Sequence, residues 1–217
     1  MFTKYGYFTI GVVSIISFFL IAVSFFIHNL PGKISLIFIA AAILLLTLNF
    51  FRDPERIPPD KKNIIVSPAD GKVLFVKKIQ DDKFVNGEAY KISVFMSPLD
   101  VHVNRIPISG KVELLNYYEG EYVAAFEDKS SELNERMEIG ITSPQGKIFF
   151  TQVAGFVARR IVNHLKSGDE VRVGERFGMI KFGSRSDIIV SSKWTPMVKK
   201  DEHVTAGETI LFELTHQ

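Results

Sequence analysis

Cysteine is absent from this chain of 217 residues. Its absence excludes disulfide bonds, catalysis by a thiolate and zinc sites built from cysteine, and it fits a reducing, intracellular location. A basic excess is also missing, because 26 basic residues stand against 24 acidic ones and the net charge is +2. Proteins that bind nucleic acid normally carry a clear basic excess. The composition therefore argues against a nucleic-acid partner.

Charge is nearly absent from the first 51 residues, which contain Lys4, Lys33 and no acidic residue. Two uncharged, apolar runs fill this part of the chain, at Tyr7–Ile27 and Ile34–Phe51. A helix needs roughly 20 apolar residues to cross the hydrocarbon core of a bilayer, with about 17 as the lower limit. Both runs reach that length, so residues 1–51 are predicted to form a membrane anchor of two helices.

The link between the two runs, His28–Lys33, contains proline and glycine, which favour a tight turn between antiparallel helices. A cleaved signal peptide would explain the first run but not the second. Four cations follow the second run and outnumber the one lysine of the link: Arg52, Arg56, Lys61 and Lys62. The positive-inside bias then predicts that the rest of the chain lies on the cytoplasmic face of the cell (inner) membrane. A hairpin that only dips into one leaflet is the alternative.

Residues 52–217 are predicted to form one β-rich domain. Three prolines and dense charge between residues 51 and 62 mark its start. Short, β-branched apolar stretches separated by turn residues follow, as expected for a barrel or sandwich. They are Ile64–Val66, Gly71–Lys77, Tyr90–Phe95, Gly110–Leu115, Tyr122–Phe126, Glu138–Thr142, Lys147–Gln152, Glu170–Val173, Arg176–Phe182, Ile188–Ser191 and Thr209–Leu214. One segment, Phe156–Leu165, has apolar residues at helical spacing and is predicted to be a short helix.

Repeated turns refine this fold prediction. Gly-Lys pairs precede strand starts in three places, and two later segments share a V-x-x-G-E spacing. Such turns resemble those of the barrel-sandwich hybrid of lipoyl and biotinyl carrier domains, although they are common in any β protein. Met197-Val198-Lys199 only loosely approaches the Met-Lys context of a modifiable lysine, so carrier function does not fit. The predicted fold is a mostly β, barrel-sandwich-hybrid-like domain with one short helix, preceded by a two-helix membrane hairpin.

Most residue types useful to catalysis fall in three short segments, at 67–71, 97–105 and 182–187. Each has an ordinary structural explanation when taken alone. Asp70-Gly71 is a common turn pair, His102 could face solvent from a strand, and Gly183-Ser184 could be a bulge. The five histidines lack paired ligand spacing, so no metal site is predicted. A P-loop, a GxGxxG fingerprint and a GxSxG elbow are all missing from the sequence.

Taken together and in order, these segments resemble the phosphatidylserine decarboxylase family. The resemblance rests on FFRDPER, SPADGKV, SPLDVHVNR, the NER of residues 134–136 and GxIxFGSRSD, and it runs from about residue 50 to the end of the chain. It is closest to the short branch of the family, found in bacteria and archaea, which carries an N-terminal hydrophobic segment. FGSR and SPADGK are specific when they occur together in this order.

The resemblance implies a proenzyme that cleaves itself between Gly183 and Ser184. Fragments 1–183 and 184–217 would then form a heterodimer, and Ser184 would become a covalent pyruvoyl group, the only cofactor implied. Gly183 has no Cβ, which lets the serine hydroxyl approach the preceding carbonyl. The implied reaction converts phosphatidylserine to phosphatidylethanolamine with release of carbon dioxide, through a Schiff base between the substrate amine and the pyruvoyl carbonyl. A serine phospholipid and the bilayer are the partners this implies.

Roles for the other site residues also come from the resemblance. Asp70 matches the family's processing aspartate, and His102 matches the histidine linked to decarboxylation, where it could act as the acid that reprotonates the product. Arg105 stands where longer members have the second, processing histidine, and arginine cannot act as a base. Three alternatives follow for cleavage: His102 assists it, Asp70 works through water, or Arg105 stabilises the oxyanion. Arg105 could equally hold the substrate carboxylate or phosphate.

Two other functions remain alternatives at this stage. The same chemistry could act on an ether lipid, as in an archaetidylserine decarboxylase, because the serine headgroup is shared. The chain could also be a non-enzymatic, membrane-anchored β-sandwich that serves as an interaction module. That second function explains the anchor and the turns, but it gives no reason for a Gly-Ser bond combined with an aspartate and a histidine.

Overall fold

The computed structural model describes residues 1–120, 134–155, 160–181 and 184–214. Within these ranges the chain divides into two compact units, Met1–Glu55 and Arg56–Gln217. The division lies four residues beyond the boundary at residue 51 that the sequence predicts. The predicted strand at 122–126 and the cleavage residue Gly183 lie outside the described residues.

The first unit is a helical hairpin. A short 3-10 turn, η1 (Lys4–Gly6), leads into α1 (Tyr7–Ser24), and α2 is formed by Leu30–Phe50. The hydroxyl of Ser17 on α1 donates to the carbonyl oxygen of Ala40 on α2, which ties the two helices together. By length and composition alone, both helices are apolar enough to cross a membrane.

The predicted turn between the helices is wrong in its second half, because α2 begins at Leu30 and includes the proline, the glycine and the lysine of the link. Asn29 is the N-cap, and its side chain accepts a hydrogen bond from the backbone N–H of Gly32. Pro31 lies in the first helical turn, where its missing N–H costs nothing. Proline and glycine here start a helix and do not interrupt one.

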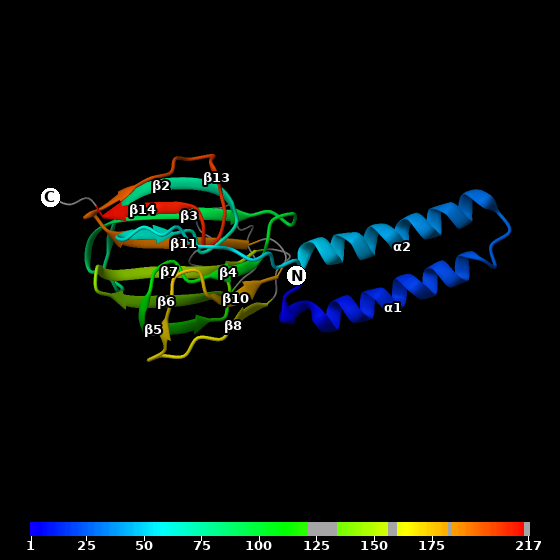
Figure 1. Ribbon diagram of the computed structural model, residues 1–217, viewed down its shortest axis with the longest axis horizontal. Helices are drawn as coiled ribbons and strands as arrows, with labels where there is room; N and C mark the ends of the chain where they lie inside the picture. The colour runs from blue at the N-terminus through cyan, green and yellow to red at the C-terminus, as the bar shows by residue number, and fades with distance from the viewer. Residues whose placement is uncertain (121–133, 156–159, 182–183, 215–217) are drawn as a thin grey trace. The chain divides into compact units, whose positions relative to one another are not determined.

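The second unit is mostly β, as the sequence predicts. Its strands are β1 (Ile64–Val66), β2 (Gly71–Asp81), β3 (Gly87–Met96), β4 (Val103–Arg105), β5 (Gly110–Tyr118), β6 (Arg136–Ser143), β7 (Gly146–Ala154), β8 (Ile161–Asn163), β9 (Glu170–Val171), β10 (Arg176–Ile180), β11 (Ser184–Ser191), β12 (Trp194–Pro196), β13 (His203–Val204) and β14 (Ile210–Leu214). The sheet of eight strands has the order β13-β2-β3-β11-β7-β6-β5-β9, and these strands curl around one core (Figure 1). Two sheets of three strands, β1-β14-β12 and β4-β10-β8, complete the unit.

The predicted helix at Phe156–Leu165 is wrong where the structure describes it. Residues 156–159 lie outside the described residues, but Ile161–Asn163 forms β8 and pairs antiparallel with β10. Ile161 and Val162 are β-branched, which favours the extended conformation once a partner strand is available. A short apolar run cannot be assigned to helix or strand from its periodicity alone.

Strand β11 lies in the interior of the large sheet, between β3 and β7. Its side chains alternate between the two faces of the sheet. Ile188 and Val190 belong to the main hydrophobic core, so Ser184 and Ser186 face the same interior side. Arg185 and Asp187 therefore face the outer side of the sheet. The strand before the predicted cleavage bond, β10, belongs to a different sheet, of order β4-β10-β8.

Candidate active site

The three candidate segments meet around Met96, the last residue of β3. Ser184 is paired with Met96 on one side and with Ala154 of β7 on the other. A Cβ on Gly71 would lie 3.2 Å from the Cα of Met96 and 2.1 Å from the carbonyl oxygen of Phe95. Only glycine fits there, and its φ of +146° is one that L side chains rarely adopt. The start of β2 and the start of β11 are thereby brought to the same place.

Segment 97–105 reaches the same point through Asn104. Its side-chain N–H₂ lies 3.3 Å from the carbonyl oxygen of Pro68 and 3.9 Å from the sulfur of Met96. Its amide oxygen accepts from Gln152, which in turn accepts from Asn163 at 3.4 Å. This chain of buried amides fixes β4 against the SPAD segment. The sequence does not predict a role for Asn104 or Gln152 in the site, because asparagine and glutamine are not usual catalytic residues.

Ser184 is fully buried, with 0% of its surface exposed. Its hydroxyl has no hydrogen-bond partner among the residues that the structure describes. Leaving a buried hydroxyl unpaired costs free energy of about 1–3 kcal/mol, so native proteins rarely do it outside functional sites. The residue that the sequence predicts to be the nucleophile therefore carries a polar group that the fold leaves unsatisfied.

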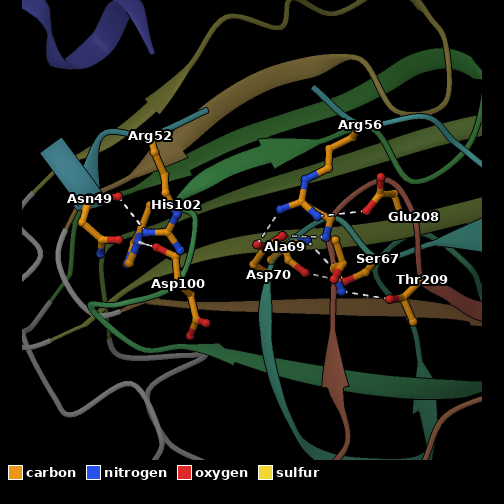
Figure 2. A network of polar contacts seen from close by, with 12 residues as sticks. Asn49, Arg52, Arg56, Ser67, Ala69, Asp70, Asp100, His102, Glu208 and Thr209 are labelled. Carbon is orange, nitrogen blue, oxygen red and sulfur yellow. Dashed lines mark hydrogen bonds and ion pairs between the residues drawn. The ribbon is translucent and has the colours of Figure 1, made fainter. Parts of the chain in front are cut away.

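Asp70 immediately precedes β2, and both of its carboxylate oxygens are engaged. One accepts from the backbone N–H of Ala206 at 2.7 Å, and the other accepts from the guanidinium of Arg56 at 2.9 Å. Figure 2 shows the Arg56 side chain extending between Asp70 and Glu208. Its guanidinium lies 3.0 Å from the Glu208 carboxylate. Burial raises the pKa of Asp70, and the Ala206 N–H and the Arg56 charge offset that rise only in part. The pKa of the Asp70 carboxyl therefore lies above its usual value.

His102 lies between the turn at Ser97–Asp100 and β4. It is completely buried, so its possible place on a solvent-facing strand is excluded. Nδ1 lies 2.9 Å from the carbonyl oxygen of Asp100, and a carbonyl can only accept, so Nδ1 carries the proton. Figure 2 shows this contact, with the Asp100 carboxylate turned away from the ring; that carboxylate accepts from the backbone N–H of Ser97 instead. The neutral ring then has its lone pair on Nε2.

Arg105 is buried at the end of β4. Its guanidinium donates to the carbonyl oxygen of Gly174 at 2.9 Å, and its backbone N–H donates to that of Pro68 at 3.0 Å. A Cβ on Gly207 would lie 2.9 Å from the Cδ of Arg105. Arg105 therefore lies near the turn that binds Asp70, and it has a contact with the backbone of the neighbouring loop.

The NER segment has a definite place in the structure. Asn134 donates to the carbonyl oxygen of Ala154 at 2.7 Å, and the Glu135 carbonyl accepts from the Ala154 N–H at 2.9 Å. Ala154 is the partner of Ser184 across the sheet. The Glu135 carboxylate also accepts from the N–H of Ile161 at 3.2 Å. The segment thus holds the end of β7 beside the candidate nucleophile.

On the outer face of the sheet, the two residues that flank Ser186 form a buried ionic cluster. Arg185 donates to Asp187 at 2.6 Å and to the hydroxyl of Ser93 at 2.9 Å, and Lys91 contacts the other carboxylate oxygen of Asp187 at 2.8 Å. Burial alone would raise the pKa of Asp187, but the charges of Lys91 and Arg185 and the hydrogen bonds from Lys91 and Ser93 lower it to about 2. This cluster begins one residue after Ser184.

The geometry brings Ser184, Asp70 and the segment of His102 and Arg105 to one end of the large sheet. Among the residues described, no group of three or more His, Asp or Glu side chains is placed to hold a metal ion. The arrangement offers a buried hydroxyl, a buried carboxylate and a buried imidazole.

Comparison with known proteins agrees with this arrangement. A family described as phosphatidylserine decarboxylase matches residues 43–212. The chain is similar to the "Phosphatidylserine decarboxylase proenzyme" of Pelodictyon phaeoclathratiforme, with 47% identity over 97% of this chain and 99% of the relative. It is 47% identical to that of Chlorobium limicola over the same shares, and 49% identical to that of Chlorobaculum tepidum over 83% of each chain.

The fold and the site thus define a β-rich domain with a buried serine at the start of an interior strand. The chain belongs to the phosphatidylserine decarboxylase family. The resemblance drawn from the sequence is confirmed, and relatives that are named as enzymes support an enzyme over an interaction module.

Proposed function

We propose that this protein is a pyruvoyl-dependent phosphatidylserine decarboxylase, made as a proenzyme that cuts itself between Gly183 and Ser184. The observation that carries the proposal is the buried hydroxyl of Ser184, which has no hydrogen-bond partner among the described residues and lies at the start of an interior strand. The names of relatives that match nearly the whole chain agree with it.

The residues around Ser184 fit a pyruvoyl group made from it. The hydroxyl is free of competing hydrogen bonds among the described residues, and strands β3 and β7 hold the backbone of Ser184 on both sides. A carbonyl that replaces this side chain would therefore be held at a fixed position. When present, the pyruvoyl carbonyl supplies the electron sink for the pair left by departing carbon dioxide.

Cleavage begins when the hydroxyl oxygen of Ser184 attacks the carbonyl carbon of Gly183. The peptide C–N bond breaks, and an ester links Gly183 to the oxygen of Ser184. Loss of the α-proton of Ser184 expels the carboxylate of Gly183 together with that oxygen, and leaves a dehydroalanine. Water then replaces the nitrogen, and ammonia departs. The serine hydroxyl is a weak nucleophile and needs a base for the first step.

Asp70 and His102 are the proposed acid–base groups. Burial raises the pKa of Asp70, which makes its carboxylate a better proton acceptor. The lone pair on Nε2 of His102, fixed by the Asp100 carbonyl, can accept a proton in processing and return one to the substrate carbon after decarboxylation. The Asp100 carbonyl, and not the Asp70 carboxylate, orients the ring, so the two groups act separately.

The substrate is proposed to be a serine phospholipid, and the two N-terminal helices are proposed to hold the enzyme at the bilayer that contains it. Residues 1–51 are the proposed anchor and 52–217 the catalytic domain, on the cytoplasmic face of the cell membrane. After cleavage, fragments 1–183 and 184–217 are proposed to stay together as a heterodimer.

The intact mass of the purified protein tests this proposal. We expect two chains, residues 1–183 and a fragment that starts at position 184 with a blocked, carbonyl-bearing end. Ser184→Ala should give a single folded chain without decarboxylase activity, because no nucleophile remains. A folded wild-type protein of 217 residues with unmodified Ser184 would overturn the proposal.

Two further assays complete the test. Diacyl and ether serine lipids assayed side by side decide between the two lipid classes. In Arg105→Ala, loss of cleavage assigns Arg105 to processing, whereas normal cleavage with loss of decarboxylation assigns it to the substrate.

A further inference from the structure

Arg56 is the first residue of the second unit and lies 14 residues before Asp70 in the sequence. It has no role in the chemistry described so far. Its guanidinium nevertheless donates directly to the proposed processing carboxylate at 2.9 Å, and both side chains are only 13% exposed. This arginine and this carboxylate are both largely shielded from solvent. They differ in this from a surface ion pair, which usually contributes less than about 1 kcal/mol to stability.

The contact determines how Asp70 is oriented. One carboxylate oxygen is bound by the N–H of Ala206 and the other by Arg56, so the two donors fix both the plane and the direction of the group. The Ala206 donor lies next to Gly207, where a Cβ would lie 2.9 Å from the Cδ of Arg105. The turn at 205–208 is therefore tightly packed, and Arg56 is the side-chain donor of the pair.

The charges that face Asp70 come from three segments. Arg56 approaches from the start of the unit, Asp100 from the loop before β4, and Glu208 from the turn at 205–208, where it shares the guanidinium of Arg56. Arg105 approaches the same turn from β4. Burial and Asp100 raise the pKa of Asp70, while the Ala206 N–H and Arg56 lower it. Arg56 is the cation that opposes burial at this carboxylate.

We propose that Arg56 is a positioning residue for self-cleavage: it orients the Asp70 carboxylate toward its proton-transfer task and supplies the positive charge beside it. This inference rests on the proposed function, since it assumes that Asp70 takes part in cleavage. Arg56 acts through Asp70.

The test measures self-cleavage of the full chain, synthesised in the presence of lipid vesicles and followed by gel from pH 5 to 9. Arg56→Gln should slow cleavage at pH 7 by roughly 10- to 100-fold, because the Asp70 carboxylate loses one of the two donors that orient it, and a misplacement of about 1 Å can cost about 100-fold. The midpoint of the pH profile should lie about one unit or more above that of the wild type, because an opposite charge typically lowers a carboxyl pKa by about 1–3 units. Arg56→Lys should retain most of the rate, because lysine keeps the positive charge. Lysine lacks the second donor group of arginine, so a small loss of rate is expected.

Two matched controls separate positioning from general charge loss. Lys61→Gln removes a cation from the same segment, where Lys61 pairs with Glu213 at 2.7 Å away from Asp70. Lys72→Gln removes a cation that pairs with Asp201 at 2.8 Å. Both should cleave within about twofold of the wild type. Millimolar guanidinium ion should speed up Arg56→Gln and leave the wild type unchanged.

The outcomes distinguish this inference from the proposed function. If the wild type is not cleaved, the proposed function fails. If the wild type is cleaved and Arg56→Gln has the same rate and pH midpoint, the inference alone is overturned. Should Arg56→Gln fail to fold, as judged by circular dichroism, Arg56→Ala assayed with and without guanidinium ion decides: a slower rate that guanidinium restores supports the inference, and a wild-type profile overturns it.

Discussion

Two aspartates of the second unit, the buried Asp187 and the partly buried Asp70, are each in contact with an arginine. Asp187, on the outer face of the sheet, is bound by Arg185, Lys91 and Ser93, and its pKa falls to about 2. Asp70 is bound by Arg56 and one backbone N–H, and its pKa is raised. The same pair of residue types thus produces opposite shifts, according to how many donors offset the burial of the carboxylate.

The difference separates a structural carboxylate from a reactive one. With two cations and a hydroxyl around it, Asp187 cannot accept a proton at any ordinary pH and serves to hold β11. With a single cation shared with Glu208, Asp70 keeps some basicity. Groups with strongly shifted pKa values cluster at functional sites. Only a carboxylate whose burial is not fully offset by donors, so that its pKa is raised, is useful for proton transfer.

The largest expected effect is on cleavage in Asp70→Asn. The amide oxygen can still accept from Ala206, but it cannot take a proton, so self-cleavage should slow by about 10²–10⁴-fold. Stability should change by less than about 1 kcal/mol, because a buried charge is removed and Glu208 still pairs with Arg56. Cleavage time courses check the predicted rate, and urea unfolding checks the predicted change in stability. A cleavage rate like that of the wild type would remove Asp70 from processing.

Asp187→Asn should show the reverse pattern. Loss of this carboxylate leaves Arg185 and Lys91 buried without their counter-charge, which typically costs about 3–5 kcal/mol. Chemical unfolding of the uncleaved Ser184→Ala background, with and without Asp187→Asn, measures that loss without interference from cleavage. A change below about 1 kcal/mol would show that the cluster does not stabilise the strand, and the contrast with Asp70 would disappear.

The smallest expected effect is the pH dependence of stability. Because the pKa of folded Asp187 is lowered to about 2, its contribution is fully present above its ordinary value of 3.8 and is lost as the pH falls toward 2. The loss is about 2 kcal/mol. Asp70 has the opposite sign: its raised pKa means that its contribution is present below 3.8 and is lost as the pH rises through the folded value.

Unfolding in the Ser184→Ala background at pH 6, 4, 3 and 2.5 measures this dependence. The Asp187→Asn variant should lack the decline assigned to Asp187. If the two proteins lose stability in parallel, the decline belongs to other carboxylates.

Much of the site could be predicted because its residues lie in short, recognisable segments. Asp70, His102 and Ser184 each fall in a motif, and β1 begins and ends where a run of β-branched apolar residues begins and ends. The role of Arg56 could not be predicted, because its contacts reach residues 14 and 152 positions away. Only the folded chain brings them together.

Other misses have similar causes. Strands β4, β8, β12 and β13 have two or three residues each, too few to show a period. Arg185 and Asp187 do carry a readable signal, since opposite charges two residues apart on a strand lie on one face. Their burial depends on Lys91 and Ser93 of the neighbouring strand, which the sequence does not place.

The position of β11 has a consequence for the protein after cleavage. The fragment 184–217 would contribute β11 to the interior of the large sheet, β13 to its edge beside β2, and β14 to a sheet with β1. The two fragments would be interlocked, with backbone ladders crossing from one to the other in two sheets. Separating them would amount to unfolding the domain, so the cut protein would behave as one cooperative unit, and neither fragment could be replaced without refolding both.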